Sequence, residues 1–308
     1  MKKAIVTGAT GFVGSYLVKE LVENGYEVFA VSRPHSRNSE RLADIPHVQI
    51  IECDLENITQ LPSLISVECD YFFHLAWEGS AGQARTDTHL QLKNVQWSVD
   101  ALRAAKALDC SRFILAGSIM EQEVIVAHGT NGEPLGPGNI YSGSKLLASI
   151  MTKAVSGEIG MEFVSAEITN AYGVGEKSLR LVNSVLQKCL RNEAPQFTSG
   201  TQNYDFVYIT DVARAFRLIA ENGTNFNNYL IGSSSAQPLK KFLLEMQQEV
   251  APNLEFVFGG VAFSSIALPL SAFDCTKTEQ DTGFHAQITF AEGCRRTSVW
   301  LKSQMEEN

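Results

Sequence analysis

The chain has 308 residues, of which 44% are apolar and 19% charged, with 23 glycines and 9 prolines. This composition is that of an ordinary folded protein and excludes a disordered, collagen-like or coiled-coil chain; the length allows two domains of about 150 residues each, or one larger domain with insertions. The formal net charge of −9, with basic residues scattered along the chain, argues against nucleic acid as a partner.

The cysteines and the apolar runs suggest where the protein works. The six cysteines form no closely spaced pair of the kind that binds metal, so we expect reduced, buried thiols and no metal site. The apolar stretch after Lys3 breaks at Thr7, which is too short for a secretory signal peptide. No apolar run approaches the ~20 residues that a membrane-spanning helix needs. We therefore expect a soluble, cytoplasmic protein without a membrane partner.

The first 170 residues alternate short apolar runs, rich in β-branched and aromatic side chains, with helical segments. Strands are expected at 4–6, 26–31, 48–51, 70–75, 113–115 and 163–168, and helices at 12–24, 87–108 and 140–155. Such strand–helix–strand alternation builds a parallel sheet with helices on both faces. The sequence therefore predicts an α/β fold with a doubly wound parallel (Rossmann) sheet.

After about residue 170 the alternation gives way to mixed, turn-rich segments. Helices are still expected at 179–190, 211–220 and 291–305. We predict a Rossmann domain over residues 1–170, completed by a segment near 204–232, and a smaller, mixed α/β domain over residues 171–308.

The segment from Thr7 to Gly14 lies between the first strand and the first helix. Its three glycines have the spacing of a dinucleotide-binding loop, and this strand–loop–helix context makes the motif specific. Gly8 can make the tight turn, Gly11 lets the backbone approach a pyrophosphate, and Gly14 lets helix and strand pack closely. The helix N-terminus offers free N–H groups and the positive end of its dipole. The residues expected to contact the dinucleotide are Gly8, Thr10, Gly11, Phe12, Val13 and Gly14.

The end of the second strand bears on which dinucleotide binds. An NAD site would carry Asp or Glu there, to accept from the ribose 2′-hydroxyl. This chain has Ser32, Arg33 and Arg37 and no acid. A carboxylate would repel a 2′-phosphate, whereas arginine can hold it through two hydrogen bonds. The sequence therefore favours NADP(H) over NAD(H); the alternative is that the arginines are solvated loop charges.

Tyr141 and Lys145 stand four residues apart, on one face of a predicted helix. Free tyrosine has a pKa near 10, and an adjacent ammonium together with an oxidised nicotinamide favours its phenolate form. Ser118, at the end of the fifth strand, could hold a substrate oxygen against the phenol. These residues predict proton exchange at a carbonyl or hydroxyl oxygen, coupled to hydride exchange at its carbon.

These motifs, together with 74–76, 170–173 and 205–213, occur in the order seen in the extended short-chain dehydrogenase/reductases. The chain resembles the nucleotide-sugar epimerase/dehydratase branch of that family from residue 1 to its tail. The resemblance implies a catalytic set of Ser118, Tyr141 and Lys145, with Lys145 also holding the nicotinamide ribose.

The resemblance also implies further contacts with the cofactor. Asp54 and Leu55 would lie beside the adenine, and Leu75 and Ala76 along the cofactor. Asn94 would lie near the active site. The helices at 87–108 and 140–155 would form a homodimer through a four-helix bundle.

On the substrate side, the resemblance implies that Asn170 contacts a sugar nucleotide. Trp77 either shapes the substrate pocket or packs in the core. Many relatives carry arginine where this chain has Glu167 and Tyr204, so a bound diphosphate would lack cations. Arg180, and with it Lys177 and Arg191, can supply the positive charge that the diphosphate would otherwise lack. The alternative is that these side chains are solvated surface charges.

The segment after Ser118 departs from the dehydratases of the family. Those enzymes follow the active-site hydroxyl with Asp-Glu, whereas this chain has Ile119 and Met120, which supply neither the acid nor the base that dehydration needs. Glu121 and Glu123 are expected as solvated loop carboxylates, with contacts to sugar hydroxyls as the alternative.

The leading functional prediction is an NADP(H)-dependent reductase of a keto sugar nucleotide of the 4-keto-6-deoxy type, with hydride from the nicotinamide and a proton from Tyr141. The alternative is an NAD(P)-dependent nucleotide-sugar 4-epimerase that uses the same residues. A third hypothesis is a non-catalytic protein that binds the cofactor as a sensor or scaffold.

Overall fold

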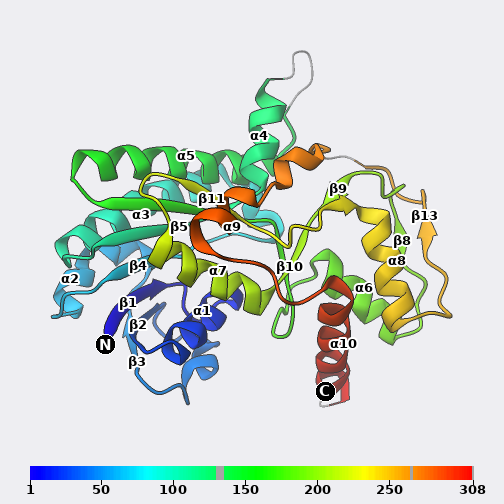
Figure 1. Ribbon diagram of the computed structural model, residues 1–308, viewed down its shortest axis with the longest axis horizontal. Helices are drawn as coiled ribbons and strands as arrows, with labels where there is room; N and C mark the ends of the chain where they lie inside the picture. The colour runs from blue at the N-terminus through cyan, green and yellow to red at the C-terminus, as the bar shows by residue number, and fades with distance from the viewer. Residues whose placement is uncertain (130–134, 264–265, 307–308) are drawn as a thin grey trace.

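A seven-stranded parallel sheet forms the larger part of the protein (Figure 1). The computed structural model describes residues 1–129, 135–263 and 266–306. The strand order is β11–β6–β5–β4–β1–β2–β3. The strands are β1 (Lys2–Thr7), β2 (Tyr26–Ser32), β3 (Val48–Glu52), β4 (Tyr71–His74), β5 (Arg112–Ser118), β6 (Glu162–Ile168) and β11 (Asn228–Ile231). The doubly wound α/β fold predicted from the sequence is confirmed, and the strand order reverses between β1 and β4, where such folds bind their ligands.

Helices cover both faces of this sheet, because successive residues of a strand point to opposite sides. They are α1 (Phe12–Glu23) and α7 (Ile209–Asn222) on one face, and α3 (Thr88–Ala107) and α5 (Gly138–Glu158) on the other. In β1, Ala4 and Val6 belong to the apolar core with α1 and α7, and Ile5 between them belongs to the core with α3. Burial on both faces explains why the strands read as continuous apolar runs.

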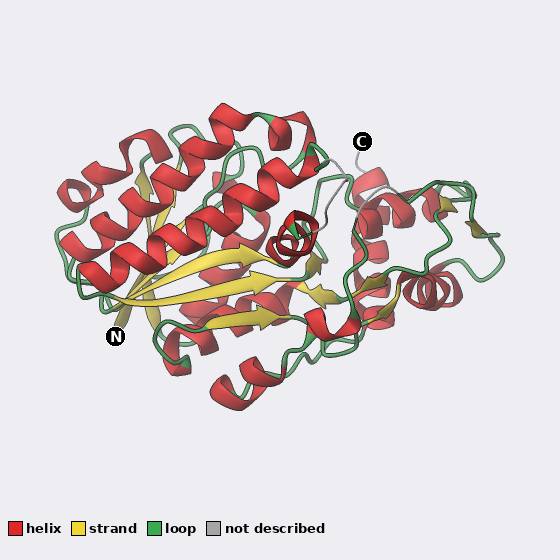
Figure 2. Ribbon diagram, turned by 90° about the horizontal axis from the view of Figure 1, so that it is seen from above, coloured by secondary structure: helices red, strands yellow, loops and turns green. Residues whose placement is uncertain are grey.

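A smaller lobe of helices and short strand pairs lies beyond one end of the sheet (Figure 2). Its helices are α6 (Leu181–Leu190), α8 (Leu239–Val250) and α10 (Phe290–Glu306). Its strand pairs are β7 (Asn170–Tyr172) with β10 (Phe206–Tyr208), β9 (Asn203–Tyr204) with β12 (Gln237–Pro238), and β8 (Gln196–Phe197) with β13 (Val257–Phe258). Aromatic rings in edge-on and tilted contact form its core: the centroid of Phe290 lies 4.9 Å from that of Phe242 and 5.0 Å from that of Phe206.

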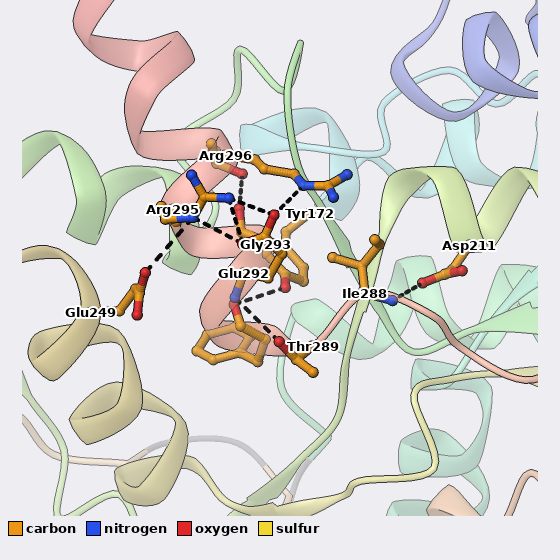
Figure 3. Close-up of polar contacts among 11 residues, drawn as sticks. Tyr172, Asp211, Glu249, Ile288, Thr289, Glu292, Gly293, Arg295 and Arg296 are labelled. Carbon is orange, nitrogen blue, oxygen red and sulfur yellow. Dashed lines mark hydrogen bonds and ion pairs between the residues drawn. The ribbon is translucent and has the colours of Figure 1, made fainter.

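Polar contacts hold the start of α10 within the lobe and tie the segment before it to α7 (Figure 3). The Tyr172 hydroxyl donates to the Phe290 carbonyl at 3.2 Å. The carboxylate of Asp211, in α7, accepts from the N–H groups of Gln287 and Ile288 at 3.0 and 2.9 Å. These contacts fix the lobe against the sheet, so that a cavity between them has a defined shape.

The structure contains elements that the sequence reading did not predict. The segment after Ser118 was expected to be a loop, but α4 (Met120–His128) begins there. The run Val124-Ile125-Val126 favours a strand by propensity, and tertiary contacts override it. Further elements are η1 (Ser39–Leu42), η2 (Leu55–Gln60), α2 (Leu61–Leu64), η3 (Gly82–Thr86), η4 (Leu270–Phe273) and α9 (Thr276–Thr282). In the described parts of the chain, no helix has the length and apolarity to cross a bilayer.

Candidate active site

A groove of about 520 Å³ opens at the carboxyl ends of β1, β2 and β4. Its lining includes the predicted dinucleotide residues Gly8, Thr10, Gly11, Phe12, Val13, Gly14, Ser32, Arg33, Leu55, Leu75 and Ala76. Gly8 has φ +68°, and a Cβ there would lie 2.9 Å from the Ala76 nitrogen. A Cβ at Gly14 would overlap the Gly8 carbonyl oxygen. The residue before α1, Gly11, makes no side-chain cap, so the first N–H groups of the helix remain available to an anion.

The other end of the groove holds part of the predicted 2′-phosphate site. The Ser32 hydroxyl is buried and, in the part of the chain that the structure describes, has no hydrogen-bond partner. Arg33 lines the groove, with its side chain 71% exposed and 3.9 Å from the Glu78 carboxylate. Arg37 is exposed and lies outside the lining. Asp54 also lies outside it and instead caps η2 by accepting from the Asn57 N–H at 3.0 Å. The groove therefore fits a dinucleotide, with Ser32 and Arg33 rather than Arg37 at this end.

Tyr141 and Ser118 lie in a second cavity, of about 310 Å³, next to the groove. Both residues line this cavity, and the hydroxyl of Ser118 acts on the phenol of Tyr141 to lower its pKa. The Met120 N–H donates to the Ser118 oxygen at 3.3 Å, which leaves the Ser118 proton free to point at the Tyr141 oxygen. Burial raises the pKa of Tyr141, while Arg85, Arg180 and the hydrogen bond from Ser118 act in the opposite direction. A phenol that can exchange a proton thus faces a cavity large enough for a small ligand.

Lys145 is buried behind this pair and lines neither cavity. Its Nζ donates to the Ala116 carbonyl at 3.0 Å and lies 3.9 Å from the centroid of the Trp77 ring. Burial lowers the pKa of Lys145 to about 8, and the charge of Glu121 opposes that shift. Trp77 lines the dinucleotide groove rather than the second cavity, and its ring lies edge-on to that of Tyr141 with 6.0 Å between centroids.

Glu121 and Glu123 are not solvated loop carboxylates, because α4 turns both toward the interior. Glu121 is 1% exposed, and its Oε1 accepts from the Ser118 N–H at 2.8 Å. Burial, and then the nearby carboxylate of Glu167, raise the pKa of Glu121 to about 8. Glu123 lines the second cavity, and burial raises its pKa to about 7. The sequence signal was a carboxyl three residues after the active-site serine, which only a helical turn brings back to it.

The walls of the second cavity are partly those predicted for substrate. Asn170 lines it and donates from Nδ2 to the Asp205 carbonyl at 2.9 Å. Arg180 lines both cavities and therefore stands at their junction, 4.0 Å from the Glu176 carboxylate. Lys177 and Arg191 are in neither lining. The outer wall is aromatic and aliphatic and includes Tyr204, Phe206, Phe263, Ile266, Leu268 and Phe273.

Asn94, on α3, and Arg85, in the loop after β4, play parts that the sequence analysis left general or missed. Asn94 accepts from the Glu78 N–H at 2.8 Å and donates to its carbonyl at 2.9 Å, so it holds the loop rather than the cavity wall. Arg85, in η3, lines the second cavity, and its guanidinium carbon lies 4.4 Å from the centroid of the Tyr141 ring. No motif marks Arg85, because only the fold brings this loop to Tyr141.

Comparison with known proteins agrees with this architecture. Residues 4–232 match the model of the "NAD dependent epimerase/dehydratase family". The chain is 26% identical to a CDP-abequose synthase of Salmonella muenchen, over 96% of each chain. It is similar in fold to the UDP-glucose 4-epimerase of Thermotoga maritima, solved with UDP-glucose, at 22% identity, with a TM-score of 0.82 over 98% of this chain and 99% of that one. It is also similar in fold to the enzyme WbmF of Bordetella bronchiseptica, solved with NADH, at 22% identity, with a TM-score of 0.81 over 99% of this chain and 93% of that one. The chain therefore belongs to the NAD-dependent epimerase/dehydratase family and is an enzyme of the extended short-chain dehydrogenase/reductase type, as its motifs predict.

Proposed function

We propose that the protein is an NADP(H)-dependent reductase of a keto sugar nucleotide, of the 4-keto-6-deoxy type. The observation that carries this proposal is that Ser118 and Tyr141 line the same cavity, which meets the dinucleotide groove at Arg180. The similarity to a CDP-abequose synthase, a protein named for a nucleotide-linked sugar, supports this class of substrate.

The residues of the groove suit the cofactor at both ends. The loop from Gly8 to Gly14 and the start of α1 would hold the pyrophosphate. Ser32 and Arg33 would hold the 2′-phosphate of NADP(H), and the unpartnered Ser32 hydroxyl supports a ligand there. When bound, the reduced nicotinamide supplies a hydride to the carbonyl carbon of the substrate.

The chain's own residues would supply the proton. The Tyr141 hydroxyl transfers its proton to the ketone oxygen, which becomes the hydroxyl of the product. Ser118 accepts from the Met120 N–H and donates to the oxygen of Tyr141, so it stabilises the phenolate left behind. Asn170 and Arg180, on the walls of the same cavity, would orient the substrate. Lys145 would hold the nicotinamide ribose if its Nζ turns from the Ala116 carbonyl toward the groove.

A sugar-nucleotide 4-epimerase that uses the same residues is the second candidate. The similar folds of the Thermotoga maritima 4-epimerase and of a Bacillus cereus 4-epimerase solved with NAD favour it. The ion pair between Arg33 and Glu78 also places an acid near the 2′-phosphate end of the groove, which favours NAD. Ile119 and Met120, directly after Ser118, offer no acid or base for dehydration, and of the two carboxyls of α4 that follow them only Glu123 lines the cavity.

The test is to identify any nucleotide that copurifies with the protein and then to titrate NADPH and NADH separately. Exchangeable NADPH bound in preference to NADH, with oxidation of NADPH when a 4-keto sugar nucleotide is added, is the expected result. Firmly retained NAD⁺ with interconversion of 4-epimers would replace the reductase by the epimerase. Failure to bind either dinucleotide would leave only the scaffold hypothesis.

A homodimer through α3 and α5 is part of the same proposal. The two helices pack side by side on one face of the sheet (Figures 1 and 2). Together they expose a set of apolar side chains, which are Leu92, Leu147, Ile150 and Met151. Apolar side chains gathered in this way suit a partner surface. Sedimentation at two protein concentrations tests it, and replacing Ile150 with Glu should give monomers.

A further inference from the structure

Arg85 stands beside the reacting phenol without belonging to any motif. Its guanidinium carbon lies 4.4 Å from the centroid of the Tyr141 ring, and both residues line the second cavity. A guanidinium over an aromatic face at this distance interacts favourably with the ring, and it interacts more strongly when the ring carries negative charge.

The position of Arg85 is built into the fold. Gln91, on α3 and fully buried, donates from Nε2 to the carbonyls of Gly79 and Ala84 at 3.1 and 3.0 Å. The Gln91 Oε1 accepts from the Trp77 indole N–H at 2.8 Å. Every polar atom of this amide is therefore used to hold the loop that carries Arg85. Because this loop is fixed, the side chain of Arg85 is held over the ring of Tyr141.

The charge of Arg85 is free to act on Tyr141. One amino group contacts the Met120 sulfur at 2.8 Å, a weak acceptor, and the buried Nε has no hydrogen-bond partner in the described residues. Within those residues no carboxylate lies within 4.0 Å of the guanidinium. Glu123 shares the cavity and feels the charge of Arg85, but burial raises its pKa to about 7, so it is only partly ionised near neutral pH.

Lys145 has other contacts in this structure. Its Nζ is bonded to the Ala116 carbonyl and lies against the Trp77 ring, which meets the Tyr141 ring edge-on at 6.0 Å between centroids. The charged or polar groups that act on Tyr141 from other elements are Arg85 on η3, Arg180 before α6, Glu121 on α4 and Ser118 on β5. Of the two cations, Arg85 has the stronger effect.

We propose that the guanidinium of Arg85 is a second cation, in addition to Lys145, that stabilises the phenolate of Tyr141. Arg85 is thus a positioning residue that acts on the reaction through Tyr141. The proposal rests on the proposed function only in that Tyr141 is the proton carrier. Lys145 keeps the role that the motif predicts, and the β4–α3 loop becomes part of the catalytic apparatus rather than a connection.

Tyrosine labelled with ¹³C at the ring carbon that bears the hydroxyl reports phenol and phenolate directly by NMR. The Tyr141 signal is identified by its loss in Tyr141→Phe, and its pH midpoint is measured with saturating NADP⁺. Arg85→Met should raise that midpoint by about one pH unit, which is a tenfold smaller phenolate fraction at a given pH. Arg85→Lys, which keeps a charge, should restore part of the shift. Arg103→Met, on the exposed face of α3, is the matched control and should leave the midpoint unchanged.

Two results would overturn the proposal. One is an unchanged midpoint in Arg85→Met with an unchanged thermal transition. The other is a shift of the same size in Arg103→Met, which would trace the change to the net charge of the protein rather than to the contact between Arg85 and the ring. The NMR titration needs no substrate, so a failure of the proposed reductase activity would be seen separately, as absent turnover beside a normal Tyr141 titration.

Discussion

The groove at the ends of β1 and β2 contains a loop of close-packed glycine backbone, whereas the cavity beside it is lined by residues from many elements and, among the described residues, has no such loop. Gly8, Gly11 and Gly14 shape the groove within seven consecutive residues, and the N–H groups of α1 complete it. The cavity joins Arg85, Ser118, Tyr141, Asn170 and Leu268, which come from distant parts of the chain. A site made of local backbone keeps its ligand class, while a site made of separate side chains can change its substrate through single replacements.

The largest effect should come from the side chain that carries the proton. Tyr141→Phe removes the hydroxyl and leaves the groove intact, so turnover should fall by about 10³-fold while the dissociation constant for the dinucleotide stays the same. Steady-state kinetics and fluorescence titration of the cofactor measure the two quantities. Turnover at the level of the unmodified protein would remove Tyr141 from the mechanism.

The next largest effect is expected from a change in the glycine loop of the groove. Gly14→Val places a side chain where the Gly8 carbonyl already lies, so it should weaken dinucleotide binding by ~100-fold or more, about 2.7 kcal/mol. Calorimetric titration measures the loss. Gly129→Ala is the control, because its added carbon would meet no atom closer than 3.5 Å. Equal affinities in the two variants would show that the loop tolerates a side chain and would break the comparison.

A smaller effect is expected at the end of the groove where side chains take over from backbone. Arg33→Ala should reduce the preference for NADPH over NADH by about fivefold, since its exposed guanidinium is screened by water. Arg37→Ala, outside the groove lining, is the matched control and should leave the preference unchanged. An effect of Arg37→Ala as large as that of Arg33→Ala would mean that the loop closes over the cofactor.

The smallest expected effect concerns stability. In the unfolded chain Glu121 loses its proton near its ordinary pKa of 4.5, but in the folded protein near 8, so the folded state is penalised as pH rises between these values. Glu121→Gln still accepts from the Ser118 N–H and removes the charge. Its melting temperature should therefore exceed that of the unmodified protein by a few degrees at pH 8.5 and by little at pH 5. A difference in melting temperature that does not change with pH would contradict the raised pKa of Glu121.

The sequence predicted the fold and the dinucleotide groove because both depend on short stretches of consecutive residues. The three-glycine loop, the apolar strands and the order of elements depend on neighbouring residues, and the family assignment follows from them. Sequence analysis misplaced Glu121, since its burial depends on the helix that carries it and on the distant elements that pack against that helix. Tyr141 and Ser118 were found only because their motifs have fixed places in the fold.

The sequence by itself determined the sheet, its glycine loop and the presence of a serine, a tyrosine and a lysine in family order. Only the tertiary structure decided that α4 brings Glu121 back under Ser118, and that Gln91 fixes a loop which places Arg85 over Tyr141. The physical reason is how far apart in the sequence the interacting residues lie. Strand pairing and helix starts follow from local periodicity and backbone geometry, whereas the charge around a buried phenol is a sum over groups that the chain brings together only when it folds.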